Sequence, residues 1–149
     1  MSINQAQSET SAELVFPDQG VIHDFAGLPV DASGWEWRLN IATASNLMRW
    51  KRLPFKCQSN LDATVRFIRH VMESQSSTSA MNTFRALVLA FQSSSFVEAD
   101  LADQVIPISL FHDLRGATHD WRLHYVRQWY SFGADHGFKN FSPEVAFAI

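Results

Sequence analysis

The chain has 149 residues, of which 46% are hydrophobic and 13% aromatic, which suffices for one well-buried core but not comfortably for two. A formal net charge of -3 is mildly unfavourable for a nucleic-acid-binding protein, and the lack of a run of about 20 apolar residues excludes a membrane span. A single cysteine, Cys57, and the lack of a signal-peptide pattern predict a cytoplasmic protein without an internal disulfide.

The first part of the chain has no helical periodicity. Residues 1–12 are polar, and we expect them to form a frayed tail. Five prolines and glycines interrupt short apolar pieces between residues 14 and 53: Pro17, Gly20, Gly27, Pro29 and Gly34. This pattern predicts an extended N-terminal arm over residues 1–59, with one short strand near residues 35–39, where apolar and charged residues alternate.

The remainder, residues 60–149, has helical spacing and predicts four helices in an all-α, four-helix-type orthogonal bundle. The first helix is expected to begin at Asn60 as its N-cap, and the second to begin near Ser79. A third helical region over residues 97–115 is expected to break at Pro107 and to end at Gly116.

The fourth helix is expected over residues 119–136, between Thr118 as N-cap and Gly137 as C-terminal cap. Its apolar sector is wide, which predicts a central position in the bundle. The predicted core joins aromatic residues of this helix to residues of the first two helices: Trp121, Tyr125, Trp129 and Phe132 against Phe67, Phe84, Val88 and Phe91.

Charge is divided unevenly along the sequence. Residues 1–37 contain six acidic residues and no Lys or Arg, whereas residues 38–70 contain seven basic residues and one acid, Asp62. Residues 71–149 contain five basic and eight acidic residues. Such segregation predicts a positive patch that attracts phosphate whatever the total charge is, and the alternative is an ordinary solvated face.

The run LHYVRQWYSFGADHGF, followed by FSPEVAFAI, resembles the last helix and exit segment of the core-binding domain of phage-integrase-type tyrosine recombinases. In that family an aromatic-rich helix ends in glycine, and a short segment, commonly Asn-Pro, leads to the catalytic domain. Here Ser142 precedes Pro143 in place of Asn. The resemblance covers about residues 60–147, through the order of four helices and the exit segment, and leaves the residues before Asn60 unassigned.

The resemblance implies a domain that clamps duplex DNA together with other recombinase subunits, while a separate catalytic domain, which this sequence lacks, exchanges strands. Phosphate and base contacts are expected from the basic patch and from polar residues of the helices. The predicted DNA-binding residues are Arg49, Lys51, Arg52, Arg66, Arg69, Thr78, Ser79, Asn82, Arg85, Arg122 and Lys139. Among them, Asn82 and Arg85 are expected to reach base edges if the second helix enters a major groove.

We expect no catalytic activity, metal or cofactor. Two His-x-x-Arg matches, at His119 and His124, lie on the expected central helix without the other recombinase partners, and the His-Asp pairs lack further metal ligands. The alternative function is a protein-interaction or assembly domain without direct DNA contact. In that case aromatic side chains near the carboxyl terminus would dock on a neighbour: Phe138, Phe141 and Phe147.

Overall fold

The structure, a computed structural model, describes residues 13–43, 45–115 and 120–149, with Asp120 and Trp121 described by their backbone only. The elements up to residue 52 are β1 (Val21–His23), β2 (Pro29–Asp31), β3 (Glu36–Arg38), β4 (Leu47–Arg49) and the 3-10 helix η1 (Trp50–Arg52). The α-helices are α2 (Gln58–Ser74), α3 (Ser77–Ala90), α4 (Ser94–Ala102), α5 (Ser109–Arg115), α6 (Asp120–Asp135) and α7 (Pro143–Ala148).

The predicted all-α bundle with an extended arm is wrong, because the chain before α2 folds into two antiparallel hairpins. Ile22 pairs with Val30 in the first hairpin, and Trp37 pairs with Met48 in the second. Glycine and proline interrupt the apolar pieces of this region because the chain turns there, and not because it is extended. Gly27, for example, has a φ of +84° in the turn between β1 and β2, a conformation that favours glycine.

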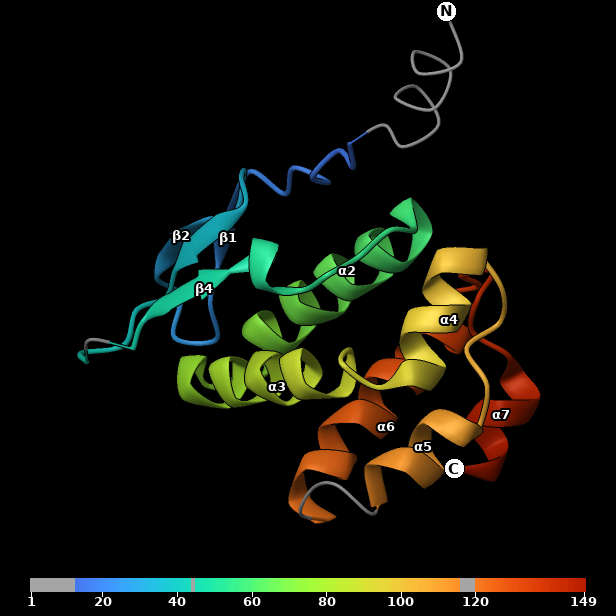
Figure 1. Cartoon of the computed structure of the whole chain (residues 1–149). Helices are drawn as coiled ribbons and strands as arrows, with labels where there is room; N and C mark the ends of the chain where they lie inside the picture. The colour runs from blue at the N-terminus through green and yellow to red at the C-terminus, as the bar shows by residue number, and fades with distance from the viewer. Residues whose placement is uncertain (1–12, 44, 116–119) are drawn as a thin grey trace, which may run out of the picture.

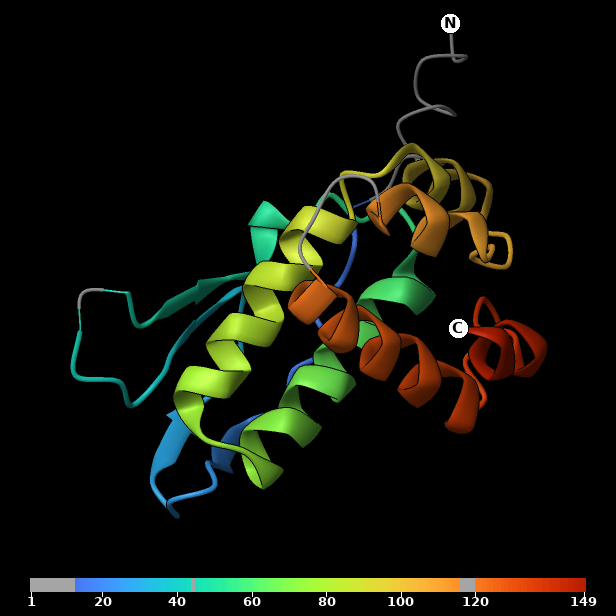
Figure 2. The same cartoon turned by 90° about the horizontal axis from the view of Figure 1, so that it is seen from below.

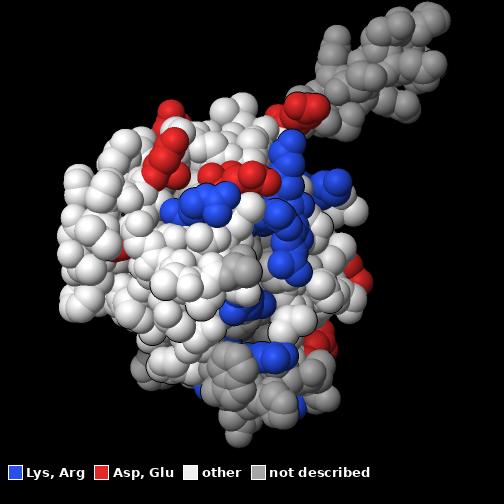
Figure 3. Space-filling model, turned by 90° about the vertical axis from the view of Figure 1, so that its left-hand side faces the viewer, with Lys and Arg blue, Asp and Glu red and all other residues white. Residues whose placement is uncertain are grey.

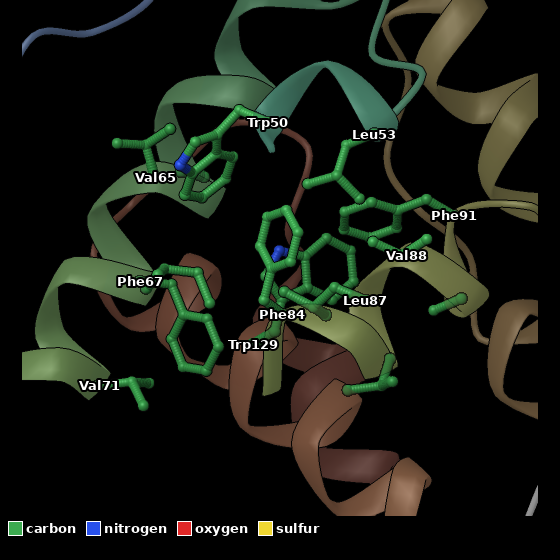
Figure 4. Packing of buried hydrophobic residues seen from close by; sticks show 14 of the residues in the cluster. Trp50, Leu53, Val65, Phe67, Val71, Phe84, Leu87, Val88, Phe91 and Trp129 are labelled. Carbon is green, nitrogen blue, oxygen red and sulfur yellow. The ribbon is translucent and has the colours of Figure 1, made fainter. Parts of the chain in front are cut away.

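Each strand contributes its middle residue to the core and exposes one or both of its outer residues. Trp37 and Trp50 are both fully buried, with ring centroids 5.1 Å apart, and Trp50 also packs edgewise on Phe84 of α3. Figure 4 shows Trp50 and Phe84 on facing elements. One cluster of buried residues therefore contains both the hairpins and the helices, across the predicted boundary at residue 60.

Helix α2 begins two residues before the predicted start, and Asn60 is not its N-cap. The N-cap is Cys57, which makes no capping bond with its side chain. Asn60 is instead fully buried, and its Nδ2 donates to Oδ1 of Asp100 in α4 over 2.9 Å. Asp100 also accepts the backbone amides of Lys56 and Cys57, so a residue distant in sequence supplies the anion near this helix start.

The other helices follow the predicted order. Ser76 caps α3 by accepting the amide of Ser79 over 3.1 Å, so this helix begins two residues before Ser79. The predicted break near Pro107 is confirmed, because residues 103–108 separate α4 from α5. Gly137 follows α6 with a φ of +73°, as expected of a C-terminal cap. The predicted caps Gly116 and Thr118 lie outside the described residues, and α7 was not predicted.

Helix α6 contacts both α2 and α3, with the hairpins toward one end of this helical layer and α4, α5 and α7 toward the other (Figures 1 and 2). Trp129 is buried against Phe91, with ring centroids 4.9 Å apart, and its Nε1 donates to Oγ1 of Thr64 over 3.0 Å. Tyr125 and Phe132 are only half-buried, and Trp121 lies outside the described side chains. Among the described residues, no helix has both the length and the apolar character to cross a membrane.

Candidate nucleic-acid interface

Helix α3 has one buried face and one outward face. Its buried residues include Met81, Phe84 and Leu87, which pack into the core. Positions separated by three or four residues line the outward face and are exposed or half-buried: Thr78, Asn82, Arg85, Leu89 and, just beyond the helix, Gln92. Because i, i+4 and i+7 positions share a face, this helix presents an amide, a guanidinium and a hydroxyl along one line.

The segment β4–η1 brings a second group of cations to the same surface. Trp50 is buried, and its neighbours Arg49, Lys51 and Arg52 are all exposed. Arg49 and Arg52 line a hollow of about 230 Å³ together with Arg85 of α3. The fold therefore gathers cations from two segments that are well separated in sequence.

Figure 3 shows Lys and Arg side chains in a strip on the face that carries the hairpins and α3, with acidic side chains close to one end of it. Glu36 is one acid on this surface, and its Oε2 lies 3.8 Å from Nε of Arg49. Both side chains are 62% exposed, so solvent screens this pair and it contributes little. We name Arg49, Lys51, Arg52 and Arg85 the basic strip.

Arg122 lies toward the other end of the outward face of α3. It shares a hollow of about 340 Å³ with Leu89, Gln92, Ser93 and Asp113, among others. Asp113 accepts hydrogen bonds from the hydroxyls of Ser93 and Ser95. Arg122 therefore shares its hollow with an acid that already accepts hydrogen bonds from two hydroxyl groups.

The start of α3 is less suited to phosphate than the sequence indicated, because the fold supplies its own anion there. The hydroxyl of Ser77 donates to Oδ2 of the buried Asp24, in the turn of the first hairpin, over 3.4 Å. Burial alone would raise the pKa of Asp24, but hydrogen bonds from Asn40, the backbone amides of the turn and Ser77 hold it below its ordinary value. Thr78 remains exposed, whereas Ser79 is engaged with the capping Ser76.

Arg66 and Arg69 line a different hollow, of about 230 Å³, between α2 and α6. The guanidinium of Arg66 lies over the ring of Phe138, 5.3 Å from its centroid. Arg69 is paired with Glu73 at 3.3 Å and donates to Gln19 over 3.1 Å. These two arginines thus have local partners, and they do not share the hollow that unites Arg49, Arg52 and Arg85.

Lys139 is neutralised by Asp103, whose Oδ2 is 2.6 Å from its Nζ. Hydrogen bonds from Lys139, Asn140 and Cys57 hold the pKa of Asp103 far below its ordinary value. Burial, together with the thiol's bond to Asp103, raises the pKa of Cys57. Cys57 is therefore not suited to be a reactive thiolate, and Lys139 is not suited to be an unpaired phosphate contact.

The aromatic side chains near the carboxyl terminus differ in how far the fold engages them. The hydroxyl of Tyr130 is buried, donates to the carbonyl of Ile106 over 2.7 Å and accepts the amide of Ser142 over 3.0 Å. Of the three aromatics expected to dock on a neighbour, Phe141 is buried against Trp129 and Phe138 is half-buried, while Phe147 is 95% exposed.

No protein-family model, curated protein or solved structure matches the chain. Within the described ranges, no group of three or more His, Cys, Asp or Glu side chains is placed to hold a metal ion. The candidate interface is therefore inferred from the positions and charges of its own residues. Sequence reasoning identified Asn82 and Arg85 but not the juxtaposition of Arg85 with Arg49 and Arg52. It also missed Trp35 and Asp24, whose surroundings depend on the hairpins.

Proposed function

We propose that the protein binds duplex DNA through the outward face of α3, with Arg49, Lys51 and Arg52 of the basic strip on the phosphate backbone. The observation that carries this proposal is the hollow that joins Arg49 and Arg52 to Arg85 beside that face. A local concentration of positive charge attracts phosphate even though the net charge of the chain is -3.

The residue types suit a helix in a major groove. The major groove admits an α-helix, Asn pairs with adenine through two hydrogen bonds, and Arg pairs with guanine in the same way. Asn82 and Arg85 stand at adjacent positions of the outward face of α3, so both can face base edges while Arg49 and Arg52 remain beside the backbone. Phosphate contacts set the position of the protein, and these two side chains supply sequence preference.

The wider role follows from the resemblance of the aromatic-rich helix and exit segment to recombinase core-binding domains. We propose that the chain clamps DNA beside other subunits of a site-specific recombinase and that the strand exchange belongs to another domain. A cytoplasmic location goes with such a role and with the single free thiol, Cys57.

A charge-reversal pair tests the interface. Replacing Arg52 and Arg85 by Glu inverts two charges of the basic strip at exposed positions, so the fold should survive while DNA binding falls. The matched control is Arg66→Glu with Arg69→Glu, which changes the net charge equally in the other hollow. Binding is measured by fluorescence anisotropy of a labelled duplex, and circular dichroism verifies the fold.

We expect the parent chain to bind with a dissociation constant of about 10⁻⁴ to 10⁻⁶ M, weakening steeply as salt rises from about 50 mM. The Arg52 and Arg85 variant should lose most of this binding, and the control should retain most of it. No association of the parent at low salt, or equal losses in the two variants, would overturn the proposal.

A protein-interaction role is the second candidate, and the exposed ring of Phe147 is the observation that favours it. Apolar docking should be insensitive to salt, unlike binding through several phosphates. Concentration-dependent self-association in sedimentation, abolished by Phe147→Ala and unaffected by salt, would support this second role.

A further inference from the structure

A second hollow on the hairpin side lies beside Trp35, whose ring takes no part in the proposed duplex contacts. Its lining is Trp35, Glu36, Arg49, Lys51 and Arg52, and its volume is about 430 Å³. Ligand sites in proteins have volumes of about 300–1,000 Å³, so the hollow can accept a group of nucleotide size. It combines one aromatic ring with three cations and one carboxylate, that of Glu36, which is paired with Arg49.

The ring of Trp35 is held in place on one side and accessible on another. Phe16 packs against it edgewise, with ring centroids 5.1 Å apart, and the backbone carbonyl of Trp35 accepts the amide of Trp50 over 2.8 Å. The side chain itself is only half-buried. Above its ring lies the ammonium of Lys51, 5.5 Å from the centroid.

From this arrangement we infer that the hollow binds an unpaired nucleotide, with the base stacked on Trp35 and the phosphates held by Lys51 and Arg52. Stacking on an aromatic side chain beside a positively charged groove is how proteins bind single-stranded nucleic acid, and it tolerates any base because every base has a π face. Lys51 has a flexible four-carbon stem, so its ammonium can move from the ring to a phosphate when a base enters.

The hollow shares two lining arginines with the hollow of the proposed duplex interface, and the inference rests on that function. Arg49 and Arg52 line both this hollow and the one shared with Arg85. A strand that leaves the duplex on this side therefore meets the same two arginines before it reaches Trp35. The structure thus predicts preference for DNA in which a paired segment is next to an unpaired one.

The test compares a blunt duplex with the same duplex bearing a single-stranded overhang. The overhang carries 2-aminopurine, a fluorescent base whose emission falls when it stacks on an indole. For the parent chain we expect roughly tenfold tighter binding to the overhang substrate, the order expected from stacking one base, and quenching of the probe. Trp35→Ala should abolish both the preference and the quenching while leaving affinity for the blunt duplex unchanged.

Two further variants separate stacking from a structural role of Trp35. Trp35→Phe keeps an aromatic ring on Phe16 and should retain part of the preference. Phe25→Ala removes an aromatic ring that is 66% exposed at the tip of the other hairpin, and it should change neither measurement. Thermal melts verify that each variant is folded.

The inference fails if the parent binds both substrates equally, or if Trp35→Ala retains the preference and the quenching. Failure of the duplex proposal has a different signature, because charge reversal of Arg52 and Arg85 would then leave binding to the blunt duplex intact. If the ammonium of Lys51 stays above the ring of Trp35 and no base replaces it, the parent chain will not quench the probe. That result also overturns the inference.

Discussion

Replacing Gly133 by Ala should destabilise the protein, although the same change stabilises most helices. Gly133 lies in α6, and a Cβ built on it would fall on the ring of Phe141. That ring is fixed, because it is 4% exposed and packs edgewise on Trp129 and Tyr130 with centroids 5.0 and 5.2 Å away. The clash therefore involves a rigid aromatic group, not the end of a flexible side chain.

Two opposing effects set the magnitude. Ala exceeds Gly in helix propensity by about 1 kcal/mol, whereas overpacking a core costs about 1–3 kcal/mol. Because Phe141 has little room to move, we take the upper half of that range and expect a net loss of about 1–2 kcal/mol in the free energy of unfolding. For a chain of this size, the melting temperature falls by about 2–4 °C per kcal/mol.

Urea denaturation followed by circular dichroism measures the change. Gly34→Ala is the matched control, because a Cβ at Gly34 meets no atom within 4 Å, and we expect it to be neutral or slightly stabilising. A double-mutant cycle with Phe141→Leu should give a coupling energy of about 0.5–3 kcal/mol, since the smaller side chain makes room for the methyl group. A Gly133→Ala variant as stable as its parent, with no coupling, would refute the packing of Phe141 on α6.

Two further predictions concern the buried indoles of Trp50 and Trp129 and the carboxylate of Asp103. The Nε1 of Trp50 is buried with no hydrogen-bond partner in the described part of the chain, whereas that of Trp129 donates to Thr64. Trp50→Phe should therefore cost less stability than Trp129→Phe, by about 1 kcal/mol in urea denaturation, and the reverse order would show that the nitrogen of Trp50 is paired. The pKa of Asp103 lies below its ordinary 3.8, so its bonds stabilise the fold above that pH and this contribution is lost as the pH falls through the folded-state pKa. The difference in melting temperature between the parent and Asp103→Asn should be constant from neutral pH to about 5 and shrink below about 4, and a difference that stays constant to strongly acidic pH would contradict the assignment.

Helices α2, α3 and α6 were predictable from sequence because their apolar residues recur at helical spacing over long segments. The break near Pro107 and the cap at Gly137 followed from backbone chemistry that acts locally. The prediction of Asn60 as an N-cap was wrong. Its residue type favours an N-cap, but its actual role depends on Asp100, a partner far along the chain. Residue type alone does not separate a capping asparagine from a buried one.

The hairpins could not be predicted because each strand is three residues long. Alternation over so few residues is a weak signal, and only the Trp35–Leu39 segment gave it clearly. The partner strand Leu47–Arg49 carries no alternation that distinguishes it from a loop. The candidate interface was accordingly predicted in pieces. Asn82 and Arg85 came from the helix pattern, but the proximity of Arg85 to Arg49 and Arg52 depends on how the second hairpin packs on α3.

Tyr130 ties the loop before α5 to the loop before α7 by hydrogen bonds. Its hydroxyl binds the carbonyl of Ile106 and the amide of Ser142, and the amide of Ile106 donates to the carbonyl of Asn140 over 2.9 Å. The loop before α5 and the loop before α7 thus share one backbone hydrogen bond, as neighbouring strands do, and the hydroxyl of Tyr130 bridges them. In solution their bonded amides should exchange with deuterium as slowly as those of the surrounding helices, and proteases should cut elsewhere first, because opening either loop breaks the contacts of both.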